Sequence, residues 1–426
     1  ALGKRRKDSL PAILLFCALV VGVLGGSTPT AAAQENKATG QENGAQRAAE
    51  DAPSPDALRV YLWTISPGDD ISSLFGHTFL VVIDPARRST VAYDFGLFQY
   101  GSDFVLQFLS GDMRFWGAPR DPEALIEKYK RQNRHVWSQE LDLDPSEAEE
   151  LYEQLRRSVS EEHKFYRYDY FLENCSTRVR DFLDRAVGGA IRSQSDAPSD
   201  TTWRFHVRRY TEPNALAYGG LHFLVGRPGD TPISKWNTMF LPLGLHDGIT
   251  DVTVERADGS KRPLVRASRH ILHADRAPPP GAPVPFHAVF AILGFGWAAL
   301  MALGVRGRSH RFWRRFLQVT GAVFYGVAAI GGLLLTFILL TDHWAMHWNQ
   351  NLALANPFAF IGLFGILRGS LPRFRMVLSA VAALGSAFWL LGPLAQDNLE
   401  WIVLLLPGHL VLAWAARRKA LTRQSS

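Results

Sequence analysis

Cysteine and histidine are the residue types in this 426-residue chain that point to covalent chemistry. The chain has two cysteines, Cys17 and Cys175. Cys17 lies in an N-terminal apolar run typical of a signal peptide, so cleavage would leave Cys175 as a single thiol in an oxidising compartment. A single thiol in an exported protein either pairs with another chain or is reactive. A buried and inert thiol is the alternative.

Cys175 stands at the head of the segment CSTRVRDFLDRAV. Val179, Phe182 and Leu183 recur at helical spacing in it, which predicts a helix that begins near the cysteine. Asn174 directly precedes the thiol and is a suitable N-cap residue; it is also a candidate for substrate contact. A helix N-terminus or a nearby imidazole favours the thiolate, which is the nucleophilic form. Cys175 is therefore the predicted nucleophile.

His77 is the favoured partner of this thiol, because it opens the apolar run HTFLVVID. An imidazole at the start of a core strand would have a fixed orientation. A purely structural histidine is the alternative, and His163, His206 and His222 are rivals that open no comparable strand. Asp94, in AYDFG on the next candidate strand, is the candidate orienting residue of a triad. A turn-capping role for this aspartate is the alternative.

Two further segments supply candidate binding residues. Tyr168, in the aromatic run before Cys175, is a candidate donor to an oxyanion, with core packing as the alternative. In TDHWAMHWNQN, His343, Asn349 and Asn351 are candidates for binding a lipid headgroup, while the two asparagines are equally suited to cap a helix. His343 and His347 have a spacing compatible with a metal pair, but no third ligand is evident. We therefore expect neither a metal nor a cofactor.

The elements that would position these residues indicate an α+β domain. Three segments have the β-branched and aromatic content of strands, and three have helical spacing, two of them opened by Asp-Pro. The predicted strands are 57–65, 77–84 and 89–98, and the predicted helices are 121–131, 144–159 and 175–187.

Composition changes along the chain predict its domain organisation. A basic N-terminus followed by an apolar run and small residues is typical of a signal peptide, and the polar Ala- and Gln-rich stretch after it is typical of a linker. The predicted units are a signal peptide (1–33), a flexible linker (34–55), an exported catalytic domain (56–276), a Pro-rich linker (277–285), a transmembrane domain (286–416) and a basic cytoplasmic tail (417–426).

Hydropathy predicts an all-α transmembrane domain of five helices. The predicted spans are 286–305, 316–340, 352–367, 377–394 and 401–416.

The charges between these spans predict their orientation. Alternate connections and the tail carry 12 Lys and Arg without any Asp or Glu, whereas the other connections carry no Lys or Arg. The positive-inside rule places the basic set in the cytoplasm and the large domain outside. The net charge of +6 could also indicate nucleic acid binding. Because the excess lies beside apolar segments, a membrane-embedded protein without a nucleic acid partner is expected instead.

The paired motifs FGHTFLVVID and ENCSTRVRDFLD resemble the Lnb-like family. The resemblance extends to ISKWNTMFLPLGLHDGI and HWAMHWNQNLALANP, and so covers most of the mature chain. It implies a permuted papain-like fold of the NlpC/P60 type, in which the histidine strand precedes the cysteine helix. By motif, His77 matches the FGH histidine and Cys175 the NC cysteine. The resemblance gives no third catalytic residue, so the prediction that Asp94 orients His77 is based only on the position of Asp94 in the sequence.

The resemblance also implies an activity. A phospholipid acyl donor would acylate Cys175 as a thioester, and the acyl chain would pass to the terminal amine of a diacylated lipoprotein. The expected location is the bacterial inner membrane, with the catalytic domain on the periplasmic side. A cell-envelope cysteine peptidase or amidase, or a lipid hydrolase of the same fold, is an alternative. A non-catalytic envelope scaffold is another, and it predicts that His77 and Cys175 lie far apart.

Overall fold

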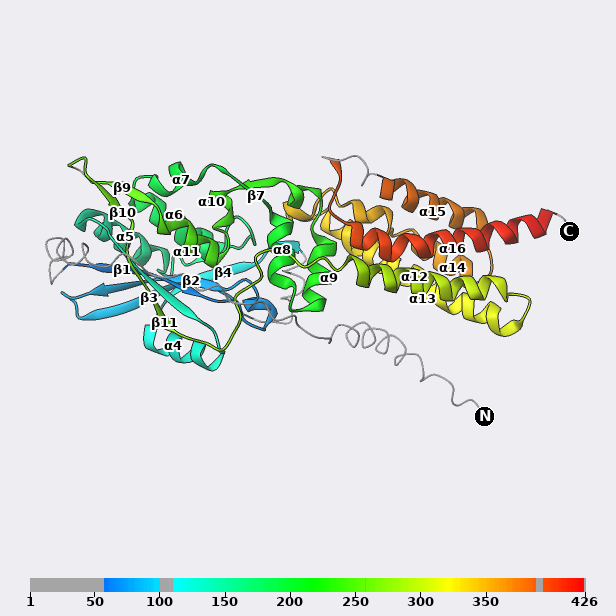
Figure 1. The fold of residues 1–426 in the computed structure, drawn as a ribbon, viewed down its shortest axis with the longest axis horizontal. Helices are drawn as coiled ribbons and strands as arrows, with labels where there is room; N and C mark the ends of the chain where they lie inside the picture. Colours follow the sequence, from blue (N-terminus) through cyan, green and yellow to red (C-terminus); the bar gives the residue numbers. More distant parts are fainter. Residues whose placement is uncertain (1–56, 100–106, 108–109, 257, 388–393, 425–426) are drawn as a thin grey trace, which may run out of the picture.

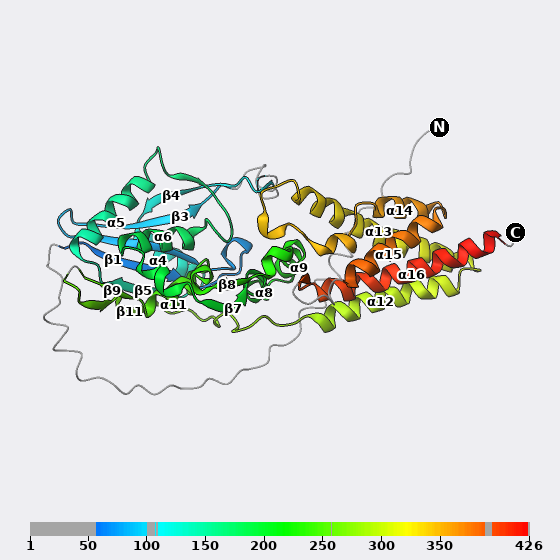
Figure 2. The ribbon, with the colours of Figure 1, turned by 90° about the horizontal axis from the view of Figure 1, so that it is seen from above.

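The computed structural model describes residues 57–99, 107, 110–256, 258–387 and 394–424. The predicted signal peptide and flexible linker lie outside these residues. A sheet-containing domain occupies one end of the molecule and a bundle of long helices the other (Figure 1). The same division is seen from above (Figure 2).

A seven-stranded sheet, antiparallel throughout, is the centre of the first domain. Ile65 pairs with His77 across the first two strands, so the histidine lies at the end of the sheet where its strand begins. In sheet order the strands are β11 (Val265–Leu272), β5 (Val136–Leu141), β1 (Arg59–Ile65), β2 (His77–Asp84), β3 (Ser89–Leu97), β4 (Arg114–Arg120) and β6 (Phe165–Arg167).

Helices cover both faces of this sheet. On one face α4 packs against β1 and β2 through Leu125 and Tyr129. On the other face α5 and α6 lie over the larger core cluster. The helices of the domain are α4 (Pro122–Arg131), α5 (Pro145–Ser158), α6 (Cys175–Ala186), α7 (Ala190–Ser195), α8 (Trp203–Thr211), α9 (Ala215–Leu224), α10 (Lys235–Thr238) and α11 (Pro242–Thr250), with 3-10 turns η1 (Ile71–Ser73) and η2 (Arg227–Asp230).

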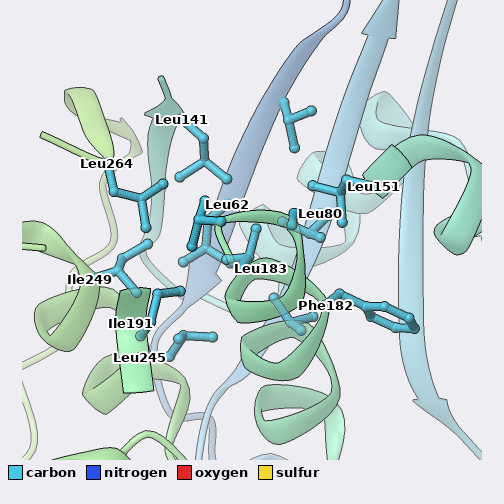
Figure 3. Close-up of a cluster of buried hydrophobic side chains, with 14 of the residues drawn as sticks. Leu62, Leu80, Leu141, Leu151, Phe182, Leu183, Ile191, Leu245, Ile249 and Leu264 are labelled. Carbon is cyan, nitrogen blue, oxygen red and sulfur yellow. The ribbon is translucent and has the colours of Figure 1, made fainter. Parts of the chain in front are cut away.

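The larger core cluster fixes α6 on the sheet (Figure 3). Leu183 of α6 is fully buried together with Leu62 of β1 and Leu80 of β2. Removal of such side chains from water is the main favourable contribution to packing a helix on a sheet. The position of Cys175 is therefore set by the apolar face of its own helix. Two small two-stranded sheets complete the domain, β7 (Pro198–Thr202) with β8 (Pro232–Ser234) and β9 (Thr253–Glu255) with β10 (Lys261–Pro263).

The second domain consists of helices that lie side by side and point away from the sheet (Figure 1). No helix or strand occurs between the end of β11 and the start of α12, where the Pro-rich linker was predicted. The elements are α12 (His287–Arg306), α13 (Arg311–Ile338), η3 (Trp344–Met346), η4 (Gln350–Ala353), α14 (Ala359–Leu367), α15 (Pro372–Ala387) and α16 (Leu399–Gln424).

The predicted count of five spans is not confirmed. Among the described residues, three helices are long and apolar enough to cross a membrane: His287–Arg306, Arg311–Ile338 and Leu399–Arg418. The helix α15 has 16 residues and is followed by residues outside the described part of the chain. The helix α14 has nine residues, about 14 Å of helix at 1.5 Å per residue, which is half the thickness of a bilayer core.

The difference at the third predicted span has a local cause. Pro357 lies within the apolar segment predicted as helical, and helices seldom continue through the residue before a proline. The segment instead begins with η4, followed by a stretch without regular structure. Leu354 in this segment is buried, and its carbonyl accepts a hydrogen bond from Nε2 of His409 at 2.8 Å. Non-helical backbone in an apolar bundle is stable only where such partners are available.

Candidate active site

Cys175 is the first residue of α6, as predicted, and its side chain is half-buried. Asn174 is the N-cap: its side-chain oxygen accepts hydrogen bonds from the backbone amides of Ser176 (2.8 Å) and Thr177 (2.9 Å). The amide nitrogen of Asn174 donates to the carbonyl oxygens of two other residues, at 2.8 and 2.9 Å. Both lone pairs and both N–H groups of this side chain are thus used within the protein. The capping prediction agrees with the structure, whereas a substrate contact by the Asn174 side chain does not.

His77 connects the thiol to a carboxylate. Its Nε2 donates a hydrogen bond to Oδ1 of Asp94 at 2.7 Å, and the Asp94 side chain is 2% exposed. Cys175 lies close enough to the His77 ring to raise the pKa of His77, both by charge and by hydrogen bonding. Because Nε2 is occupied by Asp94, Nδ1 is the nitrogen available to the thiol. The structure therefore brings together the three residues predicted as a catalytic group, and the separation of His77 from Cys175 that a scaffold predicts is not observed.

The charge state of His77 follows from these contacts. Burial lowers the pKa of His77, but the carboxylate of Asp94 and the negative charge of a Cys175 thiolate raise it more, to about 10. The ring is consequently an imidazolium at neutral pH when it faces a thiolate. An imidazolium beside a cysteine is the arrangement that favours the nucleophilic form of sulfur.

Gly96 of β3 lets the thiol approach the sheet. Its φ angle is +89°, in the left-handed region that favours glycine. A Cβ at this position would lie 3.4 Å from Cβ of Cys175, 3.9 Å from the Tyr166 hydroxyl and 4.0 Å from Cε1 of His77. These three groups therefore converge on one side of Gly96. No sequence prediction pointed to Gly96 or Tyr166; a glycine two residues after Asp94 in a core strand was the available signal.

Tyr168, the predicted oxyanion donor, lies close to the site but packs as an aromatic residue. Its ring stacks on Phe115 with centroids 4.1 Å apart and meets Tyr170 edge-on at 5.5 Å. Burial and the charge of Cys175 raise the pKa of Tyr168 above its usual value. The contacts thus favour the packing alternative, while the hydroxyl of Tyr166 is the phenol that shares the Gly96 surface with Cys175.

The loop between α13 and α14 contacts the segment that leads to Cys175. Nε1 of Trp344 donates to Oδ2 of Asp169 at 3.2 Å, and the rings of His343 and Tyr170 stack with centroids 6.0 Å apart. Arg167 forms an ion pair with Asp342 of the same loop. The helical domain therefore contacts the segment before Cys175 directly. Among the described residues, no group of three or more potential ligands is placed to hold a metal ion.

Asn349 and Asn351 hold this loop to α9. The side-chain nitrogen of each donates to the carbonyl oxygen of Phe223, at 2.9 and 3.0 Å. Asn349 caps η4 through the backbone amide of Asn351, and Asn351 accepts a hydrogen bond from Asn398 at 2.9 Å. Both side chains are buried, at 4% and 0% exposure. These contacts correspond to the capping alternative, and they correct the prediction that the two asparagines face a lipid headgroup.

Comparison with known families identifies the domain that carries these residues. Residues 45–209 match the family described as the Lnb N-terminal periplasmic domain. Over these residues the chain is similar to an Lnb-like family. The matched segment includes His77, Asp94 and Cys175 and ends before α9. The family match and the three long apolar helices together indicate a membrane protein with a periplasmic domain. Comparisons with curated proteins and with solved structures gave no match.

Proposed function

We propose that this Lnb-like protein is a cysteine acyltransferase that moves an acyl chain from a phospholipid, through a thioester on Cys175, to the N-terminal amine of a diacylated lipoprotein. The observation that carries the proposal is the contact of His77 with both Cys175 and Asp94 at the start of α6. The order of the elements, with the histidine strand before the cysteine helix, is also that of a permuted papain-like fold. In this view Cys175 is the nucleophile, His77 the acid and base, and Asp94 the orienting residue.

The residues account for both halves of the reaction. The Cys175 thiolate attacks the ester carbonyl carbon, and the carbonyl electrons move to oxygen. Collapse of this intermediate re-forms the carbonyl and expels the lysophospholipid alkoxide, which takes the proton from Nδ1 of His77. The lipoprotein amine then attacks the thioester while the neutral imidazole accepts its proton. Collapse of the second intermediate gives the amide and restores the thiolate beside an imidazolium.

Two features support a lipid substrate over a soluble one. The domain is followed by long apolar helices, and the loop between α13 and α14 packs on the segment before Cys175. A site held at the membrane surface meets phospholipids and lipid-anchored proteins without their leaving the bilayer. The inner membrane of a bacterium, with the site on the periplasmic side, is the corresponding location.

Reconstitution tests this proposal. The full chain in detergent is incubated with a phospholipid carrying a labelled acyl chain and a synthetic diacylated lipopeptide. Transfer of the label to the lipopeptide amine, absent in Cys175→Ser, is expected. Labelled free fatty acid as the sole product would instead indicate a lipid hydrolase. Cleavage of cell-wall peptide with no reaction of the lipid would indicate the peptidase or amidase alternative.

A further inference from the structure

Tyr166 of β6 carries a hydroxyl group whose environment is unusual. The oxygen is buried and has no hydrogen-bond partner among the residues that the structure describes. The Arg178 guanidinium lies over its ring, 4.2 Å from the centroid, so the ring is held in place from α6. Buried polar groups in folded proteins are nearly always paired, and an unpaired one raises the free energy of the folded state. A role in which the Tyr166 hydroxyl gains a hydrogen-bond partner during the reaction would account for this arrangement.

The hydroxyl faces the reacting groups. It lies within 4.0 Å of the same point beside Gly96 as Cβ of Cys175 and Cε1 of His77. Burial and the charge of Cys175 hold the pKa of Tyr166 well above its usual range, so the hydroxyl keeps its proton. It can therefore act only as a neutral donor toward an oxygen that develops negative charge there.

We propose that the Tyr166 hydroxyl donates a hydrogen bond to the oxyanion that forms when the Cys175 thiolate attacks an acyl carbonyl. This inference rests on the acyl-transfer function proposed above and adds a catalytic residue to it. In the step concerned, the sulfur–carbon bond forms and the carbonyl electron pair moves onto oxygen. Tyr166 stabilises that oxygen without transferring its proton, and the ester oxygen leaves when the carbonyl re-forms.

The unpaired state in the resting protein is the reason for the catalytic effect. A donor already bonded to protein would have to break that bond before it could serve the oxyanion. The Tyr166 hydroxyl has no such bond to any residue that the structure describes, so its interaction with the oxyanion appears only in the intermediate and the adjoining transition states. Interactions that are stronger in the transition state than in the ground state are those that accelerate the reaction.

Tyr166→Phe tests this role because it removes only the hydroxyl. Acylation of Cys175 is measured in the full chain with two donors, a phospholipid and a p-nitrophenyl ester, and alkylation by iodoacetamide is measured in parallel. Alkylation displaces iodide at a saturated carbon and forms no oxyanion. We expect acylation by the ester to fall by about 100-fold, the effect of losing one oxyanion donor, while alkylation is unchanged. Tyr93→Phe is the control, since it removes another buried hydroxyl from the sheet, beside Tyr152.

Each outcome decides one point. Unchanged acylation in Tyr166→Phe overturns the inference. Equal losses in acylation and alkylation also overturn it, because Tyr166 would then position the thiol. Reaction of the wild type with the p-nitrophenyl ester but not with phospholipid contradicts the proposed acyl donor, yet the comparison of ester rates still decides the role of Tyr166.

Discussion

The indole nitrogen of Trp344 donates a hydrogen bond to the carboxylate of Asp169, at 3.2 Å. Trp344 belongs to the loop between two helices of the C-terminal bundle, and Asp169 lies shortly before Cys175 in the periplasmic domain. The other carboxylate oxygen of Asp169 accepts hydrogen bonds from the backbone amides of Phe171 (2.8 Å) and Leu172 (2.9 Å). One carboxylate therefore orders the turn that leads to Cys175 and connects this turn to the helical bundle.

Trp344→Phe should weaken this connection while retaining an aromatic ring beside Phe171. A hydrogen bond to a charged group contributes about 1.5–3 kcal/mol, a factor of about 10–150, so we expect kcat to fall by about tenfold or more with little change in KM. Steady-state kinetics of acyl transfer measure both. Trp348→Phe is the matched control, since Trp348 lies in the same loop and is 80% exposed. Equal activities of the two variants would contradict the role of the loop.

Asp94→Asn should lower the pKa of His77. That pKa is raised from 6.5 to about 10 in the folded protein, with Asp94 the largest raising contribution. The interaction thus stabilises the fold fully below about pH 6.5, and its contribution is lost as the pH rises through 10. The difference in unfolding temperature between wild type and Asp94→Asn should therefore shrink from pH 6.5 to pH 10. A difference that grows over this range would show that the carboxylate does not hold an imidazolium.

Gly96→Ala should impair both stability and reactivity. An L-residue at a φ of +89° is strained, by about 1–2 kcal/mol, and the new methyl group would contact Cβ of Cys175. Gly189→Ala is the control: its φ is +86°, and nothing lies within 4 Å of the added Cβ. Both variants should lose similar stability in thermal unfolding, but only Gly96→Ala should slow alkylation of Cys175. Normal alkylation in Gly96→Ala would show that this glycine is not needed at the thiol.

The orientation of the chain gives a prediction that is the same for three spans (α12, α13 and α16) and for five spans. Reporter fusions after Arg308, between α12 and α13, and at Arg418 should both report the cytoplasm, because the basic residues concentrate there. A fusion after Asp342, where the neighbouring loop carries no Lys or Arg, should report the periplasm. A periplasmic signal at Arg308 would contradict this orientation.

Local sequence signals predicted the elements around the site well. The expected strand 77–84 is β2, and the expected helix 144–159 is α5 with its Asp144 capping box. These elements are specified by residues close in sequence, an Asp-Pro start or a continuous apolar run, so their positions can be predicted directly. The strands β4, β5, β6 and β11 were not predicted. Their side chains are less uniformly apolar, and their pairing depends on neighbours distant in the chain.

The remaining errors concern contacts that no local pattern encodes. Asn351 is polar and fully buried because it bonds α9 and Asn398, both far away in sequence. Tyr166 and Tyr168 are alike in type and two residues apart, yet only the fold shows which hydroxyl faces Gly96. The triad candidates were found because each residue type has a specific chemical role, but their proximity required the packing of α6 on the sheet.

The nucleophilic role of Cys175 is tested most directly by its own covalent intermediate. Full-length protein is incubated with phospholipid in the absence of an acceptor and then analysed by intact and peptide mass spectrometry. We expect one acyl chain on Cys175, released by hydroxylamine as a thioester must be, and no adduct in Cys175→Ser. His77→Ala should slow its formation by about 100-fold or more, as loss of an acid–base group does. Wild-type turnover in Cys175→Ser, or an acyl chain bound elsewhere than on Cys175, would contradict the account.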